Sequence, residues 1–133
     1  MRIEIATSGG FAAIPVLNAQ ASIDLAGNTA RVSDKTSGYT RTLSPDETKN
    51  VRDMIDPDRF FKLPTELRPL DSSAADQRQI DITIQLDDGR SHTVRASEGM
   101  SAELNRASPG LGQLLEWSKN EFDSIRDYKV SHR

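Results

Sequence analysis

The sequence has no cysteine, few aromatic residues and no long hydrophobic run. Without cysteine the chain has no disulfide, no thiolate nucleophile and no cysteine-based metal site. An apolar run of roughly 18 residues, the minimum for a transmembrane helix, is missing as well. The first residues, MRIEIATSGG, lack the apolar core of a secretory signal. We therefore expect a cytoplasmic protein, or one exported without a signal peptide.

Positive charge is not concentrated anywhere in the chain. The net charge is −3, and Lys and Arg are scattered without a basic run. Nucleic-acid binding needs a concentrated basic surface, so neither nucleic acid nor a membrane is an expected partner. The 133 residues, of which 35% are hydrophobic, are enough for one modest core. The sequence therefore predicts a single domain over residues 1–133, and we expect a monomer.

Short stretches of alternating apolar and polar residues predict antiparallel strands. Such stretches cover residues 2–7, 21–25, 29–32, 39–43 and 80–86, with a return strand that ends near residue 96. In the last hairpin a three-residue turn, Asp87-Asp88-Gly89, keeps the apolar face together by pairing Ile82 with Val94 and Ile80 with Ala96. A slip of one residue would place every side chain on the other face.

The segment Ser44-Pro45-Asp46-Glu47 is a helix start, with Ser as N-cap, Pro in the first turn and Glu47 able to reach back to the cap. This helix should run over residues 45–55, and a second should open at Pro109-Gly110. Residues 65–78 and 97–109 are expected to be loops, and residues 119–133 a frayed tail. The predicted fold class is α+β: an antiparallel sheet of about four or five strands with two helices packed on one face.

The residues that could support catalysis do not form a known catalytic pattern. His92 and His132 are the two histidines, and neither has metal-ligand spacing. No Gly-x-Ser-x-Gly nucleophile motif or phosphate-binding loop is present. Paired carboxylates such as Asp87 and Asp88 fit a turn better than acid–base chemistry. We therefore expect a binding protein and not an enzyme.

The stretch TSGGFAAIP, residues 7–15, places two glycines beside one of four phenylalanines. One interpretation is an apolar residue presented to a partner on a tight loop. The other is a plain hairpin turn whose Phe11 folds into the protein's own core. Composition and pattern leave both interpretations open.

The chain resembles the emfourin family, small bacterial inhibitors of protealysin-like peptidases, which are thermolysin-type zinc metallopeptidases. The specific element is Ser8-Gly9-Gly10-Phe11-Ala12, followed by Ile14, after a short N-terminal strand. More generic similarities follow in the same order along most of the chain: Leu43-Ser44-Pro45-Asp46-Glu47, Phe60-Phe61-Lys62-Leu63-Pro64, the Ile80–Ala96 hairpin and the Leu111–Trp117 helix.

The resemblance implies a bacterial, cytoplasmic inhibitor that pairs with a cognate protease. It implies no cofactor, because the zinc belongs to the partner peptidase. The implied protease-binding residues form one segment: Ser8, Gly9, Gly10, Phe11, Ala12, Ala13 and Ile14. Ala13 departs from the family pattern, in which this position is commonly Gly. A second contact is expected from the Ser33–Gly38 loop or the 65–78 loop. The alternative function is a non-inhibitory interaction module, such as a subunit or an immunity-like partner.

Overall fold

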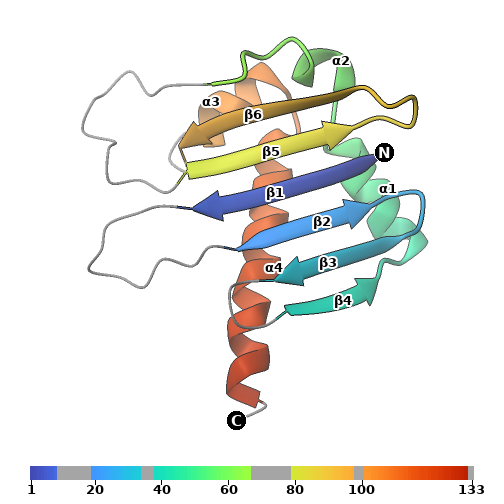
Figure 1. The fold of residues 1–133 in the computed structure, drawn as a ribbon, viewed down its shortest axis with the longest axis vertical. Helices are drawn as coiled ribbons and strands as arrows, with labels where there is room; N and C mark the ends of the chain where they lie inside the picture. Colours follow the sequence, from blue (N-terminus) through green and yellow to red (C-terminus); the bar gives the residue numbers. More distant parts are fainter. Residues whose placement is uncertain (9–18, 34–37, 67–78, 98–100, 132–133) are drawn as a thin grey trace.

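The structure is a computed structural model that describes residues 1–8, 19–33, 38–66, 79–97 and 101–131. In these ranges the chain forms one six-stranded antiparallel sheet with helices packed against it (Figure 1). The strands are β1 (Arg2–Ser8), β2 (Gln20–Asp24), β3 (Thr29–Ser33), β4 (Gly38–Thr42), β5 (Gln79–Gln85) and β6 (Ser91–Ser97). Their order is β4-β3-β2-β1-β5-β6, so the N-terminal strand is central.

The α+β class is confirmed, but the expected four or five strands were too few, since the sheet has six. Strands β2, β3 and β4 are each five residues long. Strands this short show only two or three alternations of polarity, which is a weak signal for counting them.

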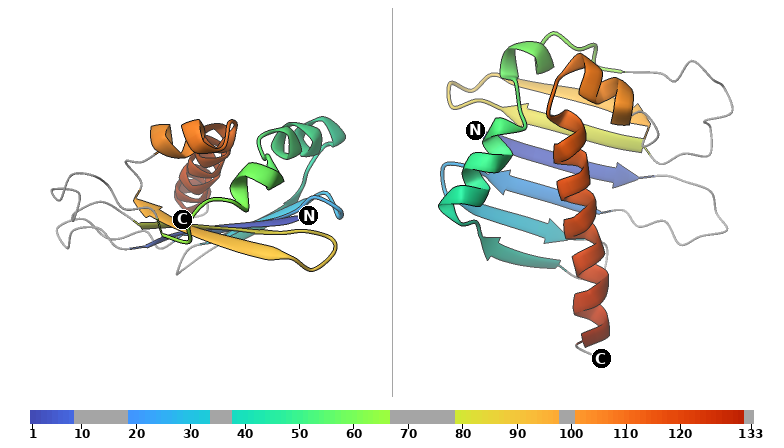
Figure 2. Two further views of the ribbon diagram at one scale, coloured as in Figure 1. Left: turned by 90° about the horizontal axis from the view of Figure 1, so that it is seen from above. Right: turned by 180° about the vertical axis from the view of Figure 1, so that it is seen from behind.

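The helices are α1 (Pro45–Asp53), α2 (Pro57–Phe60), α3 (Ser101–Ala107) and α4 (Leu111–Ser131). All lie on the same face of the sheet, as Figure 2 shows from above and from behind. The expectation of one face is confirmed, but the expected number of two helices was wrong. None of these described helices is both long and apolar enough to cross a membrane.

Helix α3 lies in the stretch for which a loop was predicted. Of its residues 102–107, Leu104 is the buried one. A single apolar anchor produces no helical periodicity, which is why sequence reasoning missed this helix. The apolar pattern also thins beyond Lys119, where a frayed tail was predicted, yet α4 continues as helix to Ser131.

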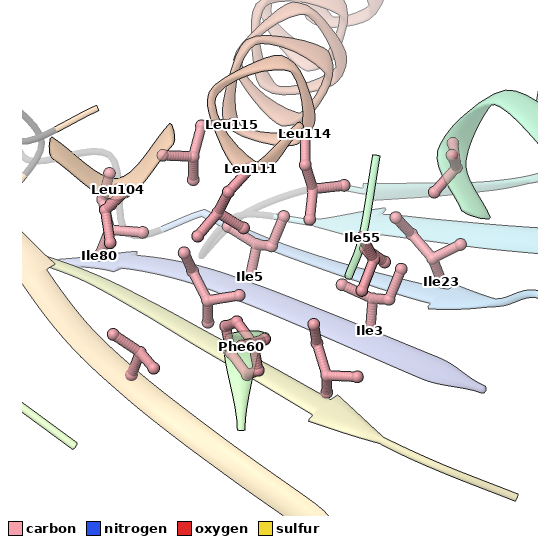
Figure 3. Close-up of a cluster of buried hydrophobic side chains, with 14 of the residues drawn as sticks. Ile3, Ile5, Ile23, Ile55, Phe60, Ile80, Leu104, Leu111, Leu114 and Leu115 are labelled. Atoms are coloured by element: carbon pink, nitrogen blue, oxygen red, sulfur yellow. The ribbon is translucent and has the colours of Figure 1, made fainter. Parts of the chain in front are cut away.

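The core lies between the sheet and the helices (Figure 3). Alternate residues of the strands, such as Ile5 and Ile82, are fully buried because the pleat turns them toward the helices. Leu114 of α4 and Phe60 of α2 are buried against them. Phe61 and Leu63 are partly buried and pack against its margin.

The β5–β6 hairpin has the predicted register. Ile82 pairs with Val94, and Ile80 pairs with Ala96. The Leu86 N–H donates to the Arg90 carbonyl oxygen (2.7 Å), so the turn contains three residues. Its last residue, Gly89, has a φ of 94°, which a side chain would disfavour.

Helix α1 begins as predicted, with the Ser44 hydroxyl oxygen accepting from the Glu47 N–H (3.1 Å). The Glu47 side chain, however, does not return to the cap. Its carboxylate binds the Arg41 guanidinium, with Nη1 and Oε2 2.9 Å apart. A guanidinium offers two parallel charge-assisted hydrogen bonds, which are stronger than one bond to a neutral amide.

Candidate functional site

The predicted binding segment begins where the central strand β1 ends. Of the predicted site residues, the structure describes Ser8, which closes β1 in register with Gln79 of β5. The others lie outside the described residues: Gly9, Gly10, Phe11, Ala12, Ala13 and Ile14. The structure therefore places the start of the segment and leaves the position of Phe11 a prediction.

The two ends of this segment are held together by the described residues that flank it. The Thr7 N–H donates to the Ala19 carbonyl oxygen (2.9 Å), and the Ala19 N–H donates to the Thr7 hydroxyl oxygen (3.3 Å). Thr7 also pairs with Ile80 across β5. The described residues that flank the segment are thus bound to each other and, through Thr7, to β5.

Residues that flank the predicted second contacts lie at the same end of the sheet. Ser33 pairs with Gln20 and with Gly38, which places both ends of the Ser33–Gly38 loop beside the end of β2. Gln79, where the chain re-enters the described region after residue 78, pairs with Ser8. Adjacent strands are about 4.8 Å apart, so the flanks of the Ser8–Ile14, Ser33–Gly38 and 65–78 segments, which lie on the neighbouring strands from β4 to β5, span about 20 Å across the sheet.

The predicted 65–78 loop is described over its first two residues. Glu66 forms an isolated parallel bridge with Arg95 of β6, and the Arg95 N–H donates to the Thr65 carbonyl oxygen (2.8 Å). This stretch thus begins attached to the edge of β6 and not as a free loop. Residues 67–78 lie outside the described residues.

A cluster of charged and aromatic side chains joins the edge strand β4 to two helices. Arg41 of β4 lies between Glu47 of α1 and Glu121 of α4 and makes ion pairs with both. Its guanidinium lies 5.8 Å from the ring centre of Trp117, whose indole N–H donates to Glu47 (3.4 Å). The Tyr39 hydroxyl donates to the Glu121 carbonyl oxygen (3.2 Å) and also binds its carboxylate. We call these five residues the β4 clamp.

Protonation in the β4 clamp follows from its contacts. The hydrogen bond from Arg41 is the main cause that holds the pKa of Glu47 below its usual value. Hydrogen bonds to Glu47 and Glu121 raise the pKa of Arg41, so its charge is retained. Burial, and then the hydrogen bond to Glu121, raises the pKa of Tyr39, so its hydroxyl stays protonated at neutral pH. Arg41 and Glu47 thus keep their charges at neutral pH, and the β4 clamp ties β4 to both helices.

Comparison with known proteins gives one match. The family model described as Emfourin matches residues 28–119, which is more than half of the chain. The chain belongs to the emfourin family. Searches of curated proteins and of solved structures found no match. Membership supports a metallopeptidase-inhibitor role in general and a protease as the kind of partner.

The matched range of this emfourin-family chain begins at Asn28 and runs from β3 into α4. It therefore includes Arg41, Glu47 and Trp117 of the β4 clamp. It does not include Ser8–Ile14, the segment on which the specific resemblance rests. Family membership and the location of the binding segment are thus supported by different parts of the chain.

Of the two histidines, His92 lies in the described part of the chain. His92 is half-buried, and its Nε2 lies 2.7 Å from the Leu63 carbonyl oxygen. Its ring centre is 5.6 Å from that of Phe60 and 5.7 Å from that of Phe61. These contacts make His92 a packing residue between two aromatic rings, and His132 lies outside the described residues. In the described ranges no three His, Cys, Asp or Glu residues are placed to hold a metal.

The sheet face opposite the helices carries an open polar hollow of about 540 Å³. Arg2 and Arg31 line it together with Glu4 and Asp24. The lining thus carries side chains of both signs of charge. Sequence reasoning did not predict this feature, and we assign it no ligand.

Proposed function

We propose that this emfourin-family chain is a proteinaceous inhibitor of a thermolysin-like, protealysin-like zinc metallopeptidase. In this proposal the segment Ser8-Gly9-Gly10-Phe11 enters the active-site cleft of the peptidase. The observation that carries the proposal is family membership, because emfourins are an inhibitor family. The location of Ser8 at the end of the central strand, with Thr7 tied to Ala19, supports the choice of segment.

The proposed mechanism is substrate mimicry. Thermolysin-type enzymes cut before bulky apolar residues, and Gly10-Phe11-Ala12 resembles such a substrate. Phe11 fills the pocket just past the scissile bond, and the Gly9-Gly10 backbone lies near the zinc of the partner, where a Cβ atom would prevent close approach. Ala13 and Ile14 extend along the cleft. The anchored base of the segment holds it in place and slows its cleavage.

Phe11 alone does not supply enough binding energy. Burying a Phe side chain contributes about 2–3 kcal/mol, whereas nanomolar affinity needs about −12 kcal/mol. A stable complex of ordinary size also buries about 800 Å² on each partner. The flanks of the Ser33–Gly38 and 67–78 segments lie at the same end of the sheet as Ser8, which supports additional contacts there.

The test is inhibition of a thermolysin-type peptidase by variants of the segment. Phe11→Ala and Gly10→Val are each expected to weaken inhibition at least tenfold while the far-UV circular dichroism and the melting temperature stay the same. Gly89→Ala, in the turn at the opposite end of the sheet, is the control and should inhibit like the parent.

The alternative, a non-inhibitory interaction module, gives a different outcome. Phe11 would then belong to the protein's own core, and Phe11→Ala would cost about 3–5 kcal/mol of stability. If both variants of the segment inhibit as well as the parent, the segment is not the binding site. The same proposal includes a monomeric protein in the bacterial cytoplasm, which sedimentation and cell fractionation test.

A further inference from the structure

The two edge strands of the sheet, β4 and β6, differ in whether other parts of the chain cover their outer edge. On one side the backbone at residues 65 and 66 covers part of β6, through the bond from the Arg95 N–H to the Thr65 carbonyl oxygen (2.8 Å). On the other side β4 ends the sheet, and none of the described strands pairs with its outer edge. Natural sheets usually block an exposed edge, because unpaired backbone groups accept strands from other chains.

The hydrogen-bond phase shows which groups of β4 face outward. The Leu43 N–H donates to the Asn28 carbonyl oxygen (2.7 Å), so this pair is a hydrogen-bonded one. Such pairs alternate along an antiparallel ladder, so Tyr39 and Arg41 direct their backbone groups to β3. Gly38, Thr40 and Thr42 therefore direct their N–H and carbonyl groups away from the sheet.

The same phase rule is verified on β6. There the bond from the Leu86 N–H to the Arg90 carbonyl oxygen fixes the phase, and the rule assigns outward backbone groups to Thr93 and Arg95. Arg95 is the residue that bonds Thr65 across the edge. The rule thus identifies an edge contact that the structure contains.

Helix α4 extends beyond the outer edge of β4. Glu121 of α4 contacts Tyr39 and Arg41, which fixes the helix above this strand. The helix then continues to Ser131, and at 1.5 Å per residue its last ten residues advance about 15 Å. A neighbouring strand would lie about 4.8 Å from β4. Figure 1 shows the C-terminal part of α4 passing beyond β4 near the end where that strand begins, so the helix would lie over one end of an added strand.

A second copy of the chain does not fit this edge in the usual two-fold manner. Seen from behind in Figure 2, α4 lies over one end of the outer strands and α1 over the other end, on the same face. A two-fold axis beside the middle of β4, perpendicular to the sheet, would bring the projecting α4 of the second copy to the end of the strands over which α1 lies. The edge therefore suits an extended segment of a different protein.

The surroundings of the edge define the segment that it accepts. On the helix side an added strand would lie beside the half-buried Tyr39, which packs against a small apolar cluster of Ala21 and Val32. On the open side it would lie beside the exposed Thr40 and Thr42. Because side chains alternate along a strand, the matching segment is extended and alternates apolar with polar residues.

We propose that the edge of β4 accepts such an extended segment of the target metallopeptidase as an added strand, and that this is the second contact of the complex. The proposal rests on the proposed inhibitor function. β4 starts at Gly38, which pairs with Ser33, and Ser33 pairs with Gln20 beside Ala6 of β1. One interface can therefore cover both this edge and the end of the sheet that carries Ser8. Strand addition supplies main-chain hydrogen bonds, while alternate side chains supply specificity.

The test uses two matched proline variants and a thermolysin-type peptidase. Thr40→Pro removes an outward N–H of β4 and leaves the ladder to β3 intact, because proline is tolerated where the N–H faces away from the sheet. Thr93→Pro makes the same change on β6. Thr40→Pro is expected to raise the inhibition constant at least tenfold, and Thr93→Pro is expected to leave it within twofold of the parent.

Amide hydrogen exchange of the unsubstituted protein keeps the test valid if a proline variant does not fold. The amides of Thr40 and Thr42 should exchange at least tenfold more slowly in the peptidase complex than in the free protein. If the parent inhibits but neither the Thr40→Pro effect nor this protection is seen, the β4 proposal is overturned and the inhibitor function stands. If the parent does not inhibit, the proposed function itself fails. Protection that grows with the concentration of the free protein would show a second copy at this edge and would also overturn the proposal.

Discussion

Gly110 is expected to tolerate a side chain far less well than Gly89, although both have nearly the same backbone conformation. The φ angles are 96° and 94°. A Cβ atom at Gly110 would lie 2.5 Å from the carbonyl oxygen of Met54 and 2.8 Å from its carbonyl carbon. At Gly89 nothing lies within 4 Å of the corresponding position. The pair therefore separates backbone strain from close packing.

The expected magnitudes follow from these two terms. Placing Ala at a positive φ costs about 1–2 kcal/mol, and the loss of freedom in the unfolded chain returns about 0.4–1 kcal/mol. Gly89→Ala should therefore cost about 1 kcal/mol. Gly110→Ala adds an overlap with backbone atoms at the end of α1, and overpacking typically costs about 1–3 kcal/mol more. We expect a total of about 3 kcal/mol for Gly110→Ala.

Urea denaturation followed by circular dichroism measures both changes in the free energy of unfolding. Equal slopes of the transition would show that the variants change stability and not the compactness of the unfolded state. Equal destabilisation by Gly110→Ala and Gly89→Ala would refute the reasoning. It would mean that the start of α4 does not pack against the backbone of Met54 as the structure shows.

Three further changes test the core and the β4 clamp. Phe60→Ala should cost about 3–5 kcal/mol in urea denaturation because the ring is fully buried, whereas a loss under 1 kcal/mol would contradict its place in the core. Arg41→Met should cost about 2 kcal/mol, because hydrogen bonds to two charged groups are lost, and an unchanged unfolding midpoint would contradict the β4 clamp. The pKa of Glu47 is lower in the folded protein than its ordinary value of 4.5, so ionised Glu47 stabilises the fold at a pH above 4.5. This contribution is lost as the pH falls from 4.5 through the lowered pKa. Glu47→Gln should therefore lower the melting temperature at pH 7 and weaken its dependence on pH below 4.5, and identical pH profiles would contradict this.

Local chemistry in the sequence predicted the parts of the fold that depend on neighbouring residues. The β5–β6 register followed from alternation and from the need for Gly89 in the turn. The start of α1 followed from Ser44 and Pro45, which act within one helical turn. In each case the interacting groups are close in the sequence, so the pattern carries the information.

Contacts between distant residues were not predictable in this way. The pairing of Ile5 with Ile82 places β1 at the centre of the sheet, and no local signal determines that order. The ion pair between Arg41 and Glu121 joins residues 80 positions apart. Arg41 and Glu47 are only six positions apart, but their contact depends on how β4 and α1 are placed relative to each other, so Glu47 looked like a capping residue.

For the candidate site, the resemblance predicted the family and the family match confirmed it. The binding segment itself remains a prediction, since the match begins at Asn28 and the structure describes Ser8 but not Gly9–Ile14. The outward edge of β4 was not foreseen at the level of residues. It depends on hydrogen-bond phase and on the projection of α4, which appear only when the strands are paired.

The most direct test of the central claim is a titration of a thermolysin-type peptidase with this protein, followed with a small peptide substrate. An inhibitor that occupies the active-site cleft should abolish peptidase activity at one molecule per enzyme, and Phe11→Ala should shift the curve at least tenfold. Full cleavage of the substrate at a large excess of the protein would contradict the account.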